Sequence, residues 1–288
     1  MGGATRGSVG GQPWHLLCLG AVSRAMRNVV AAMVGDDGKK RGGEMTNRGR
    51  YQDKRDFVIQ WLLEFQWSTP RILAQALGLK RTNQSRFFQV IQRGGLVQTI
   101  KSPFIYEHLY YLGKEGKAYA QLLSEKAESY TVTKTSVVSG LNIHHLSVQQ
   151  AVLMRSTLTL PFDFQSEWHL DLPATSRPDA IVTTGNTMTA LEVELAQKTA
   201  PRMFVGFLTH LENIKRHQYD RVEYIFTDEA LRDRYQARFA QPQWPMFTRN
   251  GKGQVLPVLD GHGNQIQAEA EDPLIRERFT FTHEALYR

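Results

Sequence analysis

Three carboxylates and one lysine in the second half of the chain have the types and spacing needed for metal-dependent chemistry. Asp179 follows Arg177-Pro178 at the start of a β-like run, and Glu192 and Glu194 lie at the end of another. In a strand these two glutamates share one face, and the aliphatic residues Leu191, Val193 and Leu195 share the other. Carboxylates held beside buried aliphatic side chains need a compensating charge, because desolvating an unpaired charge is costly.

A divalent cation would supply that charge. Carboxylate oxygens are the ligands that Mg²⁺ or Mn²⁺ prefers, so Asp179, Glu192 and Glu194 are the predicted metal ligands. Lys198 lies just beyond the glutamates and is placed to offset the charge that develops on a phosphate. The alternative is a solvent-facing antiparallel strand with alternating glutamates. The Pro-Asp pair and the 12 residues between Asp179 and Glu192 favour the metal site.

The elements around these residues predict an α/β domain of the α+β type over residues 135–288. Expected helices cover 141–158, 201–217 and 228–239, and expected strands cover 162–170, 179–184, 188–195 and 222–227. That order favours a mixed sheet with flanking helices. The last 48 residues are rich in proline and glycine turns, so they are expected to form a weakly structured periphery.

Residues 45–130 predict a separate first domain. An apolar segment at 54–66 precedes Ser68-Thr69-Pro70, which has the residue types of a helix start. Further helices are expected at 71–77, from Thr82 or Asn83 to Arg93, and at 113–128, with two strands at 96–100 and 105–112. Three helices followed by a β-hairpin is the order of a winged helix-turn-helix.

The third of these helices has the polar face of a DNA-reading helix. Arginine, asparagine and glutamine can hydrogen-bond to base edges in a major groove, and a lysine on the hairpin can reach a phosphate. The predicted DNA-binding residues are Arg81, Asn83, Gln84, Arg86, Gln89 and Lys101. The alternatives are a solvated face and a module that contacts protein.

Charge and composition agree with two modules of different character. Residues 45–128 carry a net charge of +6 and residues 129–288 carry −2, which favours polyanion binding in front of a separate activity. The sequence has no uncharged apolar run long enough to cross a bilayer. Its lone cysteine, Cys18, suits a reducing compartment, so a cytoplasmic protein is expected. Residues 1–44 are glycine-rich and are expected to be disordered or a non-native extension before Met45.

The carboxylate motif resembles that of the PD-(D/E)xK nuclease superfamily, with Pro178-Asp179, Glu192, Glu194 and Lys198 in the matching places. The usual pattern has a lysine two residues after the second acid; here Glu194 takes that place and the lysine comes four residues later. This departure is similar to the MobC class of plasmid relaxases in the replication-relaxation family, which joins a winged helix to a restriction-endonuclease-like domain. The resemblance covers Met45 to about Phe239.

This resemblance implies a DNA relaxase, a metal-dependent endonuclease that nicks one strand at a plasmid transfer origin and so initiates conjugative mobilisation. It implies that Asp179 and Glu192 bind the metal, that Glu194 shares in binding, and that Lys198 stabilises the pentavalent phosphate. The implied partners are transfer-origin DNA, an accessory mobilisation protein and the conjugation coupling machinery.

Other residues carry weaker indications. His144-His145 is adjacent, so one ring is expected to be packed and the other exposed, with His144 also a candidate neighbour of the site. His210 and His217 are interpreted as a solvated helix face. Tyr219 is the tyrosine nearest the motif in sequence, but water is the expected nucleophile.

Two other functions remain open at this point. One is a restriction-like enzyme that cuts both strands. The other is a winged-helix DNA-binding regulator whose nuclease-like domain is inactive.

Overall fold

The computed structural model describes residues 47–79, 81–103, 105–137, 142–156, 162–270 and 272–287. The predicted extension, residues 1–44, lies outside these residues. The fold is a mixed α/β structure with several sheets, as expected. None of its described helices combines the length and apolar character needed to span a bilayer.

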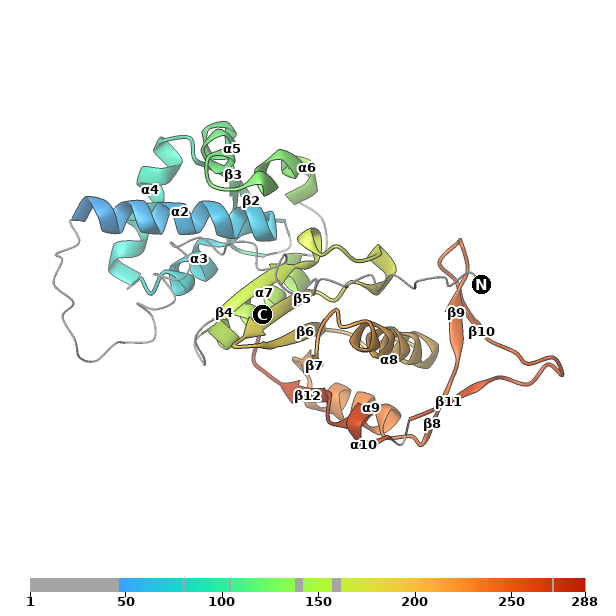
Figure 1. Cartoon of the computed structure of the whole chain (residues 1–288). Helices are drawn as coiled ribbons and strands as arrows, with labels where there is room; N and C mark the ends of the chain where they lie inside the picture. The colour runs from blue at the N-terminus through green and yellow to red at the C-terminus, as the bar shows by residue number, and fades with distance from the viewer. Residues whose placement is uncertain are drawn as a thin grey trace, which may run out of the picture.

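The first half is helical with a small sheet at its edge (Figure 1). Its elements are α2 (Asn47–Phe65), β1 (Trp67–Ser68), α3 (Pro70–Ala76), α4 (Arg81–Arg93), β2 (Val97–Lys101), β3 (His108–Leu112), α5 (Lys114–Gln121), η2 (Glu125–Ser129) and α6 (Lys134–Val137). The strands pair antiparallel in the order β1-β3-β2. The Thr69 hydroxyl caps α3 by accepting from the Ile72 amide at 3.2 Å, so the expected helix start is confirmed. The expected helix at 113–128 is shorter, because α5 ends at Gln121.

The second half contains a five-stranded sheet between helices. Its main elements are α7 (Asn142–Ser156), β4 (Phe162–Ser166), η3 (Glu167–His169), η4 (Ala174–Ser176), β5 (Ala180–Thr184), β6 (Thr187–Glu194), α8 (Ala200–Lys215), β7 (Arg221–Phe226), α9 (Glu229–Phe239) and β12 (Phe279–His283). The order is β12-β7-β6-β5-β4, with β12, β7 and β6 parallel and β6, β5 and β4 antiparallel.

The two faces of the sheet pack on different helices. Along β6, Leu191 and Val193 join the cluster that contains α7, and Ala190 joins the cluster that contains α8 and α9. The period of two in a strand therefore places Glu192 and Glu194 on the α8 side. Figure 1 shows α8 and α9 on the same side of the sheet.

The composition of the last 48 residues predicts a weakly structured periphery, and this prediction is wrong. Phe279 to His283 form β12, an edge strand of the main sheet that pairs in parallel with β7. Between α9 and β12, two antiparallel ladders project from the domain (Figure 1). They consist of β8 (Gln243–Pro245), β9 (Phe247–Arg249), β10 (Val255–Pro257) and β11 (Gln267–Glu269), and α10 (Pro273–Arg276) follows. The parallel pairing of β12 with β7 joins segments that are far apart in the sequence, so no local sequence pattern predicts it.

One hydrophobic cluster runs through both halves of the chain. It includes Trp61 and Trp67 together with residues of α7 and the sheet. The Gln149 side chain joins the halves by accepting from Trp61 Nε1 at 2.9 Å and Ser68 Oγ at 2.6 Å, and it donates to the Trp67 carbonyl. The domain boundary near residue 130 stays a prediction, but the two halves share a buried polar and apolar contact.

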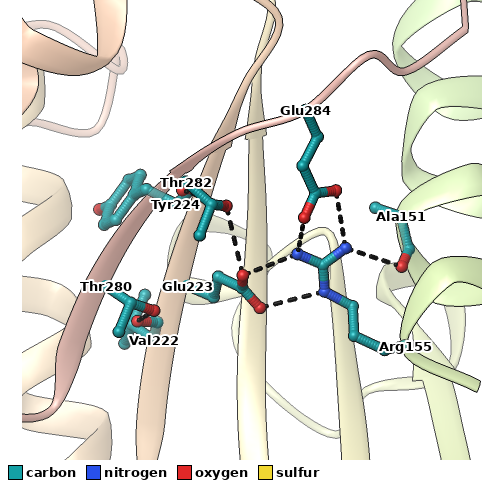
Figure 2. Close-up of polar contacts among 8 residues, drawn as sticks. All are labelled: Ala151, Arg155, Val222, Glu223, Tyr224, Thr280, Thr282 and Glu284. Atoms are coloured by element: carbon teal, nitrogen blue, oxygen red, sulfur yellow. Dashed lines mark hydrogen bonds and ion pairs between the residues drawn. The ribbon is translucent and has the colours of Figure 1, made fainter. Parts of the chain in front are cut away.

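A buried ion triad ties α7 to β7 and to the segment after β12, on the sheet face that α7 covers. Arg155 donates to both carboxylate oxygens of Glu223 on β7, at 2.7 and 3.0 Å, and to both of Glu284 after β12, at 2.7 and 2.9 Å (Figure 2). The arginine side chain is 11% exposed. Bidentate pairing suits the planar guanidinium, so this contact fixes the C-terminal segment against the core.

Replacing Arg155 with methionine should destabilise the protein by about 3 kcal/mol or more, because Glu223 and Glu284 would remain largely buried without their cation. Urea denaturation followed by circular dichroism measures this change. The matched control is Arg216→Met, whose exposed pair with Glu212 should contribute less than about 1 kcal/mol. Equal losses in the two variants would contradict the structural role of the triad.

Candidate active site

The four residues that the sequence predicts as catalytic lie in one pocket of about 440 Å³. Asp179, Glu192, Glu194 and Lys198 line it, between the sheet, η4 and the first turns of α8. The hairpin of β9 and β10 contributes further lining residues. The pairing of β5 with β6 brings these residues together, because it sets Asp179 beside Leu191, where the Asp179 amide donates to the Leu191 carbonyl.

Asp179 is held in place by three groups. Its Oδ2 accepts from the Val193 amide at 2.7 Å and lies 3.3 Å from His144 Nε2. Burial alone would raise the pKa of this carboxyl, but His144, the Val193 amide and Lys198 together lower it. Asp179 is therefore an ionised carboxylate with a fixed orientation.

His144 reaches this carboxylate from α7, on the other side of the sheet. Its Nε2 also lies 2.9 Å from the Val193 carbonyl. Burial opposes the charged ring, but the Asp179 carboxylate outweighs it and raises the pKa of His144 to about 9. The expectation for the pair is confirmed for His145, which is buried against Trp67 and bonds the Phe65 carbonyl. His144 was expected to be exposed, but its ring is partly buried because it contacts Asp179, which confirms it as a neighbour of the site.

Glu192 and Glu194 share Lys198. The lysine Nζ lies 2.5 Å from Glu194 Oε1 and 4.0 Å from Glu192 Oε2. Burial raises the pKa of Glu194 to about 7, although Lys198 favours its charged form. The Tyr235 hydroxyl, which also lines the pocket, is the one buried side-chain polar atom within the described residues that lacks a hydrogen-bond partner.

His210 was expected on a solvated face, and this interpretation is wrong. The ring is 4% exposed and lies between α8 and the sheet, with Nε2 3.3 Å from Glu192 Oε1. Its Nδ1 is 2.6 Å from the Tyr219 hydroxyl, which also accepts from Asn213 Nδ2 at 3.0 Å. The His210 ring therefore bridges the Tyr219 hydroxyl and the Glu192 carboxylate. His217 is exposed, as expected.

The tyrosines of the site are poorly suited to be nucleophiles. Tyr219, Tyr224 and Tyr235 are buried, and burial raises the pKa of each. A neutral, desolvated phenol is a weak nucleophile. Water as the nucleophile stays a prediction.

The pocket contains carboxylate oxygens that could bind a hard cation, but in the part of the chain that the structure describes they are not arranged around one point. Within the described residues no group of three or more histidine, cysteine, aspartate or glutamate side chains is arranged to hold one metal ion. The pocket carboxylates face Lys198, His144 and His210 instead. Three carboxylates in one pocket still fit Mg²⁺ or Mn²⁺ by donor type. Metal binding stays a prediction.

The predicted DNA-binding residues lie elsewhere. Arg86 and Gln89 are exposed on α4, and Lys101 is exposed at the end of β2. The side chains of Arg81, Asn83 and Gln84 lie outside the described part of the structure, although their backbone belongs to α4. None of the three described side chains lines the carboxylate pocket.

Sequence reasoning missed His210 on α8 and also the pocket residues of the C-terminal hairpin. Arg249, Gly253 and Val255 line the pocket, but their segment has no motif that links it to the carboxylates. Comparison with known proteins found no matching family model, no matching curated protein and no matching solved structure.

Glu194→Gln should gain stability relative to the wild type as the pH rises. Its pKa of about 7 in the folded state, against an ordinary value of 4.5, means that the folded protein binds the extra proton between these values. Wild-type stability therefore falls across this window, by at most about 3 kcal/mol, and the amide removes the effect. Urea denaturation at about pH 5 and about pH 8 measures the difference.

The control for this measurement is Glu229→Gln, an exposed glutamate on α9. Its difference from the wild type should be the same at both pH values. A Glu194→Gln difference that is equally flat would show that Glu194 is not a buried, proton-holding carboxyl.

Proposed function

We propose that the protein is a relaxase, a metal-dependent endonuclease that nicks one DNA strand at a plasmid transfer origin and so starts conjugative mobilisation. The observation that carries the proposal is the convergence of Asp179, Glu192, Glu194 and Lys198 in one pocket. Glu192 and Glu194 come from one strand face that is buried under a helix.

The order of elements supports the same proposal. The succession α7-β4-β5-β6-α8-β7, with its mixed sheet, is the arrangement expected of a restriction-endonuclease-like domain. In front of it, α2-β1-α3-α4-β2-β3 with the sheet order β1-β3-β2 is the arrangement expected of a winged helix. Exposed Arg86 and Gln89 on α4 are suited to base edges, and exposed Lys101 is suited to a phosphate.

In the proposed phosphodiester hydrolysis, the residues of the pocket have different roles. Asp179 and Glu192, with Glu194 sharing, would hold Mg²⁺ or Mn²⁺, which supplies positive charge for the phosphate and lowers the pKa of a bound water. His144 fixes the orientation of Asp179, and His210 fixes that of Glu192. Lys198 turns from the glutamates toward the phosphate as negative charge builds on its oxygens.

In the proposed step, water attacks the phosphodiester, and no protein side chain forms a bond to phosphorus. A water oxygen bonds to phosphorus, and the bond from phosphorus to one sugar oxygen breaks with its electron pair passing to that oxygen. One proton of the water passes, through a carboxylate or solvent, to the leaving sugar oxygen, which becomes a hydroxyl; the other stays on the new phosphate monoester or passes to solvent. The proposed partners are transfer-origin DNA, an accessory mobilisation protein and the conjugation coupling machinery. A restriction-like double-strand endonuclease and a winged-helix regulator are the alternatives that the experiment must separate.

The test uses the full chain with supercoiled plasmid that carries a candidate transfer origin, in Mn²⁺ or in EDTA. The wild type should produce open circles only with metal. Asp179→Asn should bind the origin but lose nicking by at least about 100-fold, because a principal carboxylate ligand is removed. Agarose electrophoresis measures nicking, and a mobility shift measures binding.

Asp233→Asn is the control, since Asp233 is exposed on α9 and does not line the pocket; it should nick like the wild type. Linear product from the wild type would support the restriction-like alternative. Binding without any cleavage in metal would favour the regulator. Normal nicking by Asp179→Asn would contradict the site assignment.

A further inference from the structure

Three exposed arginines stand around the mouth of the acidic pocket. Arg177 follows η4, Arg202 lies in the first turn of α8, and Arg249 ends β9. All three line the pocket whose inner residues include the three carboxylates. We call Arg177, Arg202 and Arg249 the arginine rim.

The arginines of the rim are available to a ligand. Other arginines of the second half, such as Arg155, Arg216 and Arg232, make ion pairs with carboxylates. No arginine of the rim makes an ion pair within the described residues. Arg177 donates through Nε to the Leu172 carbonyl and lies near enough to Glu167 to favour the charged form of that carboxyl. Three guanidinium groups without ion pairs in one place favour an anion with several charges.

The two C-terminal ladders hold Arg249 at this rim, because their base is buried in the core and backbone hydrogen bonds join them. We call residues 243–269 the β arm. Trp244 anchors its base, since the indole is fully buried in the core beside α8 and donates to the Phe239 carbonyl. Backbone hydrogen bonds from Met246 to Ile266 and from Val258 to Met246 join the two ladders. The arm is therefore an ordered extension of the domain.

The turn of the arm presents a further cation beside the pocket. In the turn between β9 and β10, the Asn250 side chain accepts from the Lys252 and Gln254 amides at 3.0 and 2.9 Å. Lys252 is exposed in this turn, and its neighbour Gly253 lines the pocket. Gly253 has a φ of +76°, a conformation that a glycine adopts without strain.

We infer that the β arm and the arginine rim form a second DNA-contact surface, which holds backbone phosphates on either side of the phosphodiester at the carboxylates. The inference deepens the proposed function and rests on it. An acidic pocket repels a polyanionic strand, so cations around its mouth are needed to keep DNA close. Bidentate guanidinium groups are well shaped for phosphates. This surface is separate from α4. It contacts phosphates and not bases, so its binding does not depend on the DNA sequence.

The experiment measures the affinity of the full chain for fluorescein-labelled transfer-origin DNA, as duplex and as single strand, by anisotropy in EDTA over a series of salt concentrations. Arg249→Ala should weaken binding several-fold and lower the slope of log K against log salt by about 1, as expected for one lost phosphate contact. Arg249→Lys should recover part of the affinity, since it keeps the charge without the fork.

Arg234→Ala is the matched control, because Arg234 is exposed on α9 and does not line the pocket. It should leave affinity and slope unchanged, and both variants should keep the wild-type melting temperature. A loss on duplex, on single strand or on both supports the inference and identifies the form that the arm holds. Arg249→Ala binding like Arg234→Ala on both DNAs overturns it.

The failure of this inference is distinguishable from the failure of the proposed function, because the binding measurement in EDTA needs no cleavage. Wild-type nicking with metal together with unchanged Arg249→Ala binding would remove the β arm from the DNA surface and leave the relaxase proposal standing. Normal nicking by Asp179→Asn would remove the relaxase site whatever the arm does.

Discussion

The burial of two carboxylates at the end of β6 determines which groups must surround them in the pocket. Glu192 and Glu194 lie on the strand face that α8 covers, and the Glu194 side chain is 4% exposed. Each therefore needs a compensating group: Lys198 lies against Glu194, and His210 lies against Glu192. Such an arrangement costs folding free energy, which is typical of sites maintained for chemistry rather than for stability.

Helix α7 connects this site to both ends of the chain. His144 orients Asp179 at the pocket, and Gln149 bonds Trp61 and Ser68 in the first half. At the other end of the helix, Arg155 pairs with Glu223 and Glu284. One rigid helix thus contacts the carboxylate pocket, the helical half and the C-terminal segment. This continuity would keep the helix proposed to read DNA and the proposed cutting site in a defined relation.

What the sequence predicts well is local. The alternation that puts Glu192 and Glu194 on one face needs only the period of a strand, and the cap at Thr69 needs only three residues. What it misses depends on pairing between distant segments. The burial of His210 follows from which face α8 turns toward the sheet, and β12 pairs with β7 over more than 50 intervening residues. The position of Arg249 at the pocket likewise depends on contacts between segments that are distant in the sequence.

Titration calorimetry with Mn²⁺ measures directly whether the carboxylate pocket binds a divalent cation, as we propose. The full-length wild type should bind Mn²⁺, and Asp179→Asn should lose at least about tenfold in affinity. Asp233→Asn, with the same change of charge on exposed α9, should bind like the wild type. Equal Mn²⁺ binding by all three proteins, or none by the wild type, would contradict the account.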